Sequence, residues 1–226
     1  MDEQGITRRG ALARLGGLAA LALGAGAWQG DAEGAGPAAV AAGLVTCVLT
    51  PEQTEGPYYI ADERVRRNIT EGRPGTSLTL RTTVVSASNC KPIKGAAVDV
   101  WHADASGTYS GVLGNTGTFM RGIQRTNAKG LALFQTVYPG WYQGRTVHIH
   151  VKVHIGGNVV HTGQLYFPDT LTDAVYRNAP YASRPARGTR NANDSVYRNG
   201  GRKSMLTVHK SGSDYIAAIA MGVQRS

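Results

Sequence analysis

Cysteine is scarce in this sequence, with only Cys47 and Cys90 among 226 residues. A cysteine-rich zinc site needs three or four thiolates, so the sequence excludes that class of site. Acidic residues are also few, with 15 Asp and Glu against 24 Lys and Arg and a formal net charge of +9. There is neither a basic helix nor the aromatic pattern of an RNA-binding module. We therefore expect no nucleic-acid partner and interpret the charge as a basic, soluble surface.

Long hydrophobic runs are absent outside the N-terminal region. An apolar run over residues 15–28 is short for a membrane span and follows the Arg8-Arg9 pair. This pattern resembles a twin-arginine export signal, although Ala11 stands where that signal usually has Phe. We expect residues 1–27 to be a twin-arginine-type signal peptide, with an N-terminal membrane anchor as the alternative. The predicted location is extracellular, periplasmic or in the cell envelope.

The next segment, residues 28–46, is rich in Gly and Ala and has few large side chains, so we interpret it as a linker. Residues 47–226 then form one predicted domain. In an exported chain, Cys47 and Cys90 can form a disulfide, for which chain entropy predicts a stabilisation of roughly 4 kcal/mol. Two separate buried thiols are the alternative.

The predicted domain is rich in short, alternating, β-branched runs between Gly and Pro turns. These runs predict strands at residues 77–87, 96–102, 130–137, 146–155, 159–167, 204–209 and 215–223. Residues 171–177 predict a short helix, whereas residues 181–201 lack periodicity and are interpreted as a surface excursion. The pattern favours an all-β fold, an antiparallel β-sandwich with immunoglobulin- or transthyretin-like layers, long loops and little helix.

Two histidines, His148 and His150, lie two residues apart in one of these strands. Side chains at i and i+2 of a strand point to the same face, so two imidazoles there make half of a metal site. A lone strand histidine is more often structural. His154 has the same parity but lies further along the strand, and His102 is interpreted as a packed core residue.

The histidine pair has no Asp or Glu close to it in sequence, so a site with two histidines and one carboxylate for Fe(II) lacks its third ligand. The available oxygen donors are Tyr142, after a Pro-Gly turn, and Tyr109, in a loop. Two phenolates are hard anionic donors and would stabilise Fe(III) over Fe(II). The alternative for each tyrosine is a half-buried aromatic without a metal.

Four segments carry a wider similarity: TPEQTEGPYYI, GAAVDVWHADASGTYS, TFMRGIQRTNAKGLALFQTVYPGWYQGRTVHIHVKV and TGQLYFPD. Together they cover most of the range 50–169, and they resemble the intradiol ring-cleavage dioxygenases. That family includes the catechol 1,2- and protocatechuate 3,4-dioxygenases. The chain looks most similar to the exported, single-domain members.

The resemblance implies one non-haem Fe(III) per chain, held by Tyr109, Tyr142, His148 and His150. Tyr142 would also be catalytic, because it leaves the metal and accepts a proton when substrate binds. Arg145 matches the active-site arginine of the family, where it stabilises charge on the substrate ring. The glutamine of the Q-L-Y-F segment matches Gln164, which would hydrogen-bond oxygen during the reaction. The loop between Tyr142 and His148 is shorter than in the long catechol enzymes.

The activity implied is the cleavage of a catechol-type diol by O2, between its hydroxyl-bearing carbons, to a muconate-type diacid. This would serve the catabolism of aromatic compounds. Pro57, Tyr58 and Tyr59, with Arg145, are the predicted substrate-binding residues, because aromatic rings stack on a flat catechol. The alternative for the first three is packing within their own loop. Two alternatives remain: an exported transthyretin-like binding module, and an iron- or copper-binding protein without turnover. A homo-oligomer is compatible with the family.

Overall fold

The computed structural model of the chain describes residues 49–61 and 64–224. The predicted signal peptide, the linker and Cys47 lie outside these ranges. Cys90 is not a free thiol, but its predicted bridge to Cys47 stays a prediction. No helix within the described ranges is both long and apolar enough to cross a membrane.

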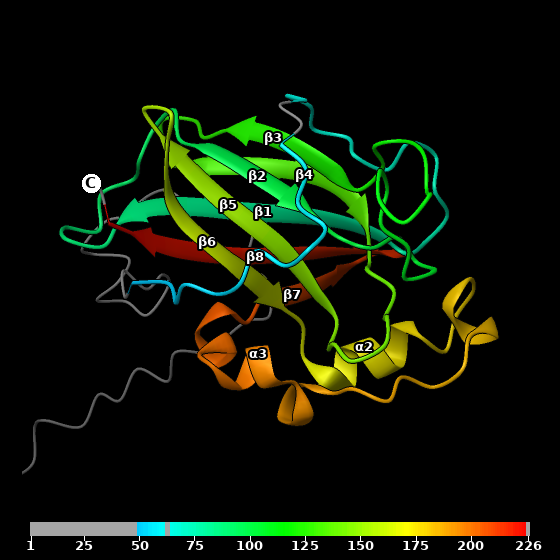
Figure 1. Cartoon of the computed structure of the whole chain (residues 1–226). Coiled ribbons are helices and arrows are strands. Elements are labelled where there is room, and N and C mark those ends of the chain that lie inside the picture. Colours follow the sequence, from blue (N-terminus) through cyan, green and yellow to red (C-terminus); the bar gives the residue numbers. More distant parts are fainter. Residues whose placement is uncertain (1–48, 62–63, 225–226) are drawn as a thin grey trace, which may run out of the picture. The chain divides into compact units, whose positions relative to one another are not determined.

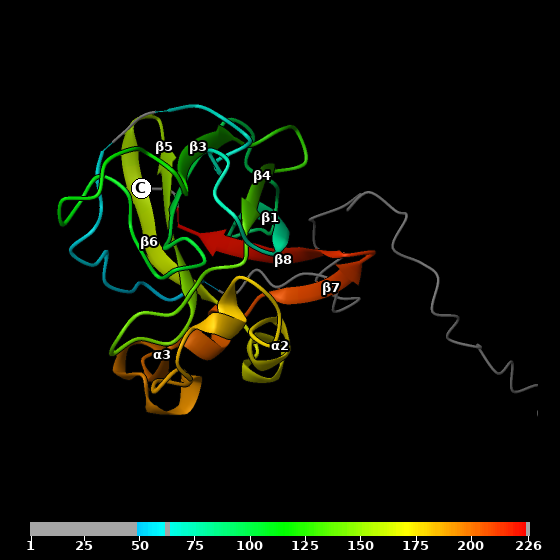
Figure 2. The same ribbon diagram turned by 90° about the vertical axis from the view of Figure 1, so that its right-hand side faces the viewer.

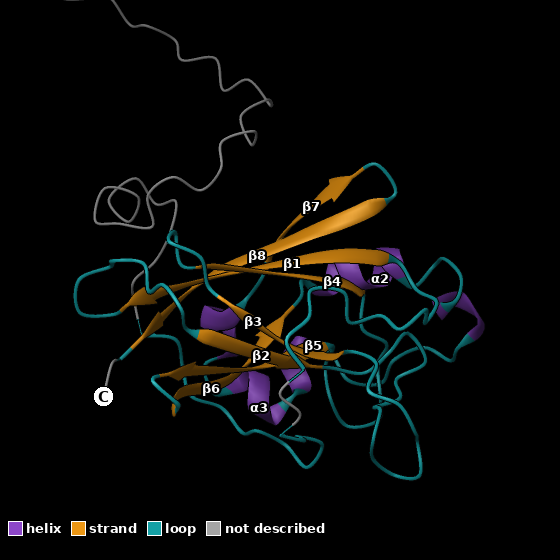
Figure 3. Cartoon of the chain, turned by 90° about the horizontal axis from the view of Figure 1, so that it is seen from above, coloured by secondary structure: helices purple, strands orange, loops and turns teal. Residues whose placement is uncertain are grey.

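Two four-stranded sheets form the layers of the fold (Figure 1). In spatial order, the first sheet contains β4 (Leu131–Val137), β1 (Ser77–Ser86), β8 (Asp214–Val223) and β7 (Thr207–Ser211). The second sheet contains β3 (Arg121–Arg125), β2 (Ala97–Trp101), β5 (His148–Ile155) and β6 (Asn158–Tyr166). Figure 3 shows the two layers from above.

The core between the sheets follows from the alternation of the strands. Leu78 and Leu80 of β1 and Val151 of β5 have at most 1 % of their surface exposed and belong to one buried cluster. Each such side chain contributes roughly 2 kcal/mol by leaving water. Because successive strand residues point to opposite faces, the residues of β5 on either side of Val151 face away from the core.

The predicted β-sandwich is confirmed. One strand pair departs from the antiparallel pattern, because β1 and β8 run parallel. Strand β3 was not predicted, and the helix predicted at residues 171–177 is α2 (Asp169–Val175). The strand predicted from residue 146 begins as β5 at His148.

The hairpin between β5 and β6 sets the register beside the histidines. Its two turn residues, Gly156 and Gly157, both have positive φ, at 60° and 89°. A two-residue turn of this kind matches the twist of the flanking strands, and glycine adopts it without strain. The register then shifts by one residue between Val153 and His154, so that Gln164 of β6, and not Gly163, lies directly beside His150 of β5.

The interpretation of residues 181–201 as a surface excursion is wrong for several of its residues. The segment contains η1 (Tyr181–Ser183), η2 (Asn191–Asn193) and α3 (Ser195–Arg198), and η3 (Gly201–Ser204) begins at its last residue. Tyr181, Asn191 and Asp194 are buried. Together with α2 the segment lies at one end of the sandwich, at the bottom of Figures 1 and 2.

Candidate metal centre

The outer face of the second sheet carries His148 and His150. His150 pairs with Trp101 of β2 on one side and with Gln164 of β6 on the other. The Nε2 atoms of the two histidines lie 3.0 Å apart, and both side chains are buried. The predicted common face of the two imidazoles is thus present, under the loops that cover this sheet.

Trp101 fixes the ring of His150. The two rings are stacked, with centroids 4.9 Å apart and an angle of 7°. Gly56, in the loop before β1, lies so close that a Cβ there would be 3.1 Å from His150 Cε1. Trp101 is a site residue that the sequence did not predict. His102, by contrast, is a buried core residue whose Nδ1 lies 2.8 Å from the Ala103 carbonyl oxygen.

The two predicted tyrosines meet at the histidines. Tyr142 Oη lies 3.2 Å from His148 Nε2. The ring of Tyr109 lies 5.6 Å from that of Tyr142 and 6.1 Å from that of His150, between centroids. The structure therefore brings together all four predicted donors, which come from three separate parts of the chain. We refer to these four residues as the four-donor cluster.

Asp104, which was not predicted as a site residue, organises the loop that carries Tyr109. Its carboxylate accepts hydrogen bonds from the backbone N–H groups of Ser106, at 2.9 Å, and Thr108, at 3.0 Å. Its backbone carbonyl accepts the N–H of Gly140 at 2.9 Å. This contact joins the Tyr109 loop to the Pro-Gly turn before Tyr142. The signal in sequence is the D-x-S-x-T spacing, typical of a side-chain-stabilised turn.

The protonation states suit metal ligands. Burial, helped by the positive charge of Arg145, lowers the pKa of His148 to about 3. Burial and the neighbouring His148 also lower the pKa of His150 well below its usual range. Both imidazoles are therefore neutral at pH 7 and can offer a lone pair. Burial raises the pKa of Tyr109 and of Tyr142, so their phenolates require a nearby cation.

The donor set fits a cation better than it fits a closed hydrogen-bond network. His148 Nδ1 donates to the Thr146 carbonyl oxygen at 2.6 Å, which leaves its Nε2 without a proton. The buried Tyr109 hydroxyl has no well-formed hydrogen bond within the described ranges. Those ranges also hold no group of three or more His, Cys, Asp or Glu suited to a metal. Any metal here therefore depends on tyrosine oxygens, and two anionic phenolates with two imidazoles suit Fe(III).

Arg145 and Gln164 form a pair beside the four-donor cluster. Arg145 Nη2 donates a hydrogen bond to Gln164 Oε1 at 2.5 Å, and Gln164 Nε2 donates to the Thr54 carbonyl oxygen at 2.9 Å. The charge of Arg145 acts on the pKa values of both histidines and both tyrosines of the cluster. Both residues were predicted from sequence, and the structure brings them together.

The three predicted wall residues occupy different positions. Tyr58 lies over the cluster, with its ring 4.8 Å from that of Tyr109 and 6.3 Å from that of Tyr142. Pro57 is exposed. Tyr59 is one step further away, against Trp101 at 4.8 Å.

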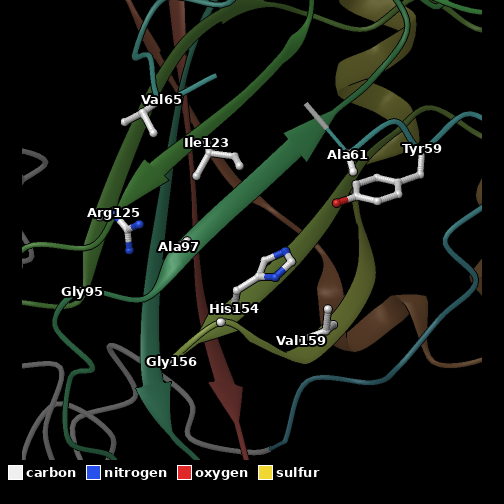
Figure 4. A pocket seen from close by; sticks show the side chains of 11 residues that line it. Tyr59, Ala61, Val65, Gly95, Ala97, Ile123, Arg125, His154, Gly156 and Val159 are labelled. Carbon is white, nitrogen blue, oxygen red and sulfur yellow. The ribbon is translucent and has the colours of Figure 1, made fainter. Parts of the chain in front are cut away.

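Tyr59 also lines a second hollow, further along the same face of the sheet. This hollow has a volume of about 530 Å³, and its walls include Ile123, Arg125 and His154. Figure 4 shows the Tyr59 hydroxyl directed into it. The ammonium group of Lys152 lies 3.6 Å from the centroid of the Tyr59 ring. Tyr59 thus borders a space separate from the four-donor cluster.

Comparison with known proteins agrees with this geometry. The sequence model of a family described as dioxygenase matches residues 54–179. An intradiol ring-cleavage dioxygenase from Tetranychus urticae is 34% identical, with a TM-score of 0.76, over 79% of this chain and 95% of that one. The dioxygenase domain of a carbohydrate-binding fusion protein from Streptomyces sp. SirexAA-E is 33% identical, with a TM-score of 0.62, over 79% and 100% of the two chains.

Curated relatives match over shorter stretches. Catechol 1,2-dioxygenase 2 of Acinetobacter lwoffii is 36% identical over 43% of this chain and 38% of its own length. Chlorocatechol 1,2-dioxygenase of Pseudomonas sp. (strain P51) is 28% identical over 50% and 53%. The chain thus spans roughly two fifths to half of the length of these two proteins. With the family match over more than half of this chain and the similarity to solved structures, the chain belongs to the intradiol ring-cleavage dioxygenases.

Proposed function

We propose that this chain is a non-haem Fe(III) intradiol dioxygenase. It cleaves a catechol-type diol between the two hydroxyl-bearing carbons and adds both atoms of O2, so that the product is a muconate-type diacid. The observation that carries the proposal is the convergence of two tyrosine oxygens and two histidine nitrogens in one buried cluster. A binding module without turnover has no need of such a donor set.

Tyr109, Tyr142, His148 and His150 would hold one iron. When bound, Fe(III) acts as a Lewis acid that lowers the pKa of the catechol hydroxyls and makes the ring reactive toward O2. Trp101 and the Thr146 carbonyl oxygen keep the two imidazoles in the orientation that this requires. Burial of the cluster excludes water and strengthens every electrostatic interaction in it.

Tyr142 is the group that takes a proton from the substrate. It is half-buried and follows a turn in the connection between β4 and β5, whereas Tyr109 is almost fully buried. The more accessible phenolate can move aside and accept the proton of one catechol hydroxyl. Arg145 then faces the negative charge that develops on the substrate ring. Gln164, held by Arg145 and the Thr54 carbonyl oxygen, offers a fixed dipole next to it.

The substrate class follows from the aromatic surroundings and from the relatives. Tyr58 lies over Tyr109 and Tyr142 and can stack on a flat ring. The curated relatives are named for catechol and chlorocatechol. A single-ring diol is therefore the proposed substrate.

Oxygen uptake by the iron-loaded protein, measured with a panel of catechols, tests this function. We expect one O2 to be consumed per catechol, with a diacid as the product. A protein that contains a full complement of iron but consumes no O2 with any member of the panel would contradict the proposal. A band in the visible spectrum that shifts on anaerobic addition of catechol would support iron–tyrosinate coordination.

We also propose that residues 1–27 direct export and that Cys47 and Cys90 form a disulfide afterwards. The Arg8-Arg9 pair and the following apolar run support the export signal. Replacing both arginines by lysine should keep the protein in the cytoplasm, as measured by fractionation of cells. A thiol count on the unfolded, unreduced exported protein should find no free thiol, and a count of two would exclude the bridge.

A further inference from the structure

The buried carboxylate of Asp194 binds Arg145 and the segment just before His148. Its Oδ2 accepts hydrogen bonds from Arg145 Nε at 2.9 Å and from the Thr146 backbone N–H at 2.7 Å. Its Oδ1 accepts the backbone N–H groups of Val196 at 2.8 Å and Tyr197 at 2.9 Å, and so caps α3. One side chain therefore joins the short helix to the segment that leads into β5.

A second set of contacts connects α3 to Gln164, through Gln53 and Tyr166. Gln53 Nε2 donates to the carbonyl oxygens of Val196, at 2.8 Å, and Asn199, at 3.0 Å. The Tyr166 hydroxyl lies 3.0 Å from Gln53 Oε1 and 3.1 Å from Gln164 Oε1. Gln164 Oε1 also accepts the hydrogen bond from Arg145 (2.5 Å).

These side chains form a ring of contacts at hydrogen-bond distance. It runs from Asp194 to Arg145, Gln164, Tyr166 and Gln53, and then through α3 back to Asp194. Of these five side chains, Tyr166, Gln164 and Asp194 have at most 1 % of their surface exposed. The single hydroxyl proton of Tyr166 bonds either Gln53 Oε1 or Gln164 Oε1 at any one time. The other hydrogen bonds of the ring still allow few alternative rotamers, because a change leaves a buried polar group unpaired.

We propose that Asp194 is a positioning residue that holds Arg145, and through it Gln164, in one fixed arrangement toward the four-donor cluster. Within the described residues Asp194 has no hydrogen bond to any of the four donors, and it reaches them through Arg145 and through the Thr146 backbone, whose carbonyl oxygen holds His148. The effect on turnover rests on the proposed function, whereas the effect on the position of Arg145 does not. A misplaced guanidinium would still attract the substrate but would stabilise less of the charge that develops during reaction.

Asp194→Asn tests the ring with little change in shape. An asparagine that caps α3 with its oxygen must turn its NH2 group toward Thr146 N–H and Arg145 Nε–H, which are also donors. The matched control is Asp173→Asn. Asp173 binds Arg187 and Arg190 within the same C-terminal region and has no contact with Arg145. The activity of Asp173→Asn therefore measures the effect of loosening that region without a change at Arg145.

In iron-loaded protein, we expect Asp194→Asn to lower kcat at least tenfold with less than a threefold change in KM. The iron content and the visible band should stay as in the wild type. Asp173→Asn should keep kcat within twofold. The proposal is overturned if Asp194→Asn matches the control, or if its activity falls only in proportion to lost iron.

A second measurement is independent of turnover. In the iron-free protein, the exchange of the Arg145 Nε–H proton with solvent is measured by ¹⁵N NMR. Asp194→Asn should accelerate this exchange at least tenfold, whereas Asp173→Asn should leave it unchanged. Equal exchange in wild type and Asp194→Asn would overturn the positioning role even if the protein is an active dioxygenase. A wild type that consumes no O2 would instead refute the proposed function.

Discussion

At the scale of single residues, the two tyrosines of the cluster differ in burial. Tyr109 is 4% exposed, whereas Tyr142 is half-buried and lies in a connection between strands. Tyr109→Phe should therefore reduce iron retention, while Tyr142→Phe should retain iron and lose turnover by about 10²–10⁴-fold, the usual contribution of a proton-transfer group. Iron content and kcat, measured on the same preparations, check this. Iron loss in Tyr142→Phe together with retention in Tyr109→Phe would reverse the two roles.

His102 gives the protein a pH-dependent stability. Burial lowers the pKa of His102 to about 4 from an ordinary value of 6.5. Below pH 6.5, His102 therefore binds a proton in the unfolded chain, whereas in the folded chain it binds one only at about pH 4 and below. This stability is complete above pH 6.5 and is lost as the pH falls to about 4, by roughly 3 kcal/mol at most.

The contribution of His102 is measured as a difference. Urea unfolding of wild type and His102→Asn, at several pH values between 7 and 4, should show a smaller loss of unfolding free energy in the variant. Because the charge of His102 also acts on the pKa values of His148 and His150, the difference includes this coupling. Parallel curves would show that His102 does not carry this pH dependence.

The site residues that the sequence predicted are those with a local pattern. His148 and His150 follow from strand parity, and the segments shared with a known family point to Tyr109, Tyr142 and Arg145. Trp101 and Asp194 were missed. Their roles come from contacts with residues 49 positions away in both cases, Trp101 with His150 and Asp194 with Arg145. No local spacing encodes such pairs.

At the scale of elements, the close approach of two loops holds the tyrosines together. A Cβ on Gly140 would lie 2.7 Å from the Asp104 carbonyl oxygen and would also clash with that of Ala105. Gly140→Ala should therefore destabilise the protein by about 1–3 kcal/mol and weaken iron binding, because the backbones must separate. Thermal unfolding and iron titration measure this. The control, Gly188→Ala, has no atom within 4 Å of the new Cβ, and an equal loss in it would contradict the explanation.

Elements with a regular apolar pattern were predicted, whereas those that depend on strand pairing or on side-chain hydrogen bonds were not. The sequence of β3, RGIQR, has one apolar side chain, so its extended form depends on pairing with β2. The segment 181–201 has no hydrophobic period, yet Asn191 and Asp194 are buried through bonds to Thr146. The hydrophobic periodicity of a sequence indicates which apolar side chains are buried, but it does not indicate which polar side chains are buried.

At the scale of the whole molecule, the sandwich and the site have separate sources of stability. The core between the sheets is a continuous apolar cluster, whereas the four-donor cluster lies on the outer face of one sheet, under loops. The fold therefore does not depend on a metal to form its core. The site does depend on a metal, because the Tyr109 hydroxyl and the neighbouring Nε2 atoms of His148 and His150 gain a common partner only with a cation.

Removal of iron by a chelator should therefore change the loops and leave the strands. We expect the visible band to disappear and the far-ultraviolet circular dichroism to stay unchanged. At iron a thousandfold above its Kd, binding stabilises the native state by about 4 kcal/mol. For a chain of this size, that corresponds to a loss of Tm on the order of 10 °C on removal. A Tm that is the same with and without iron would show that the four donors do not bind it, since a ligand of the native state must stabilise it.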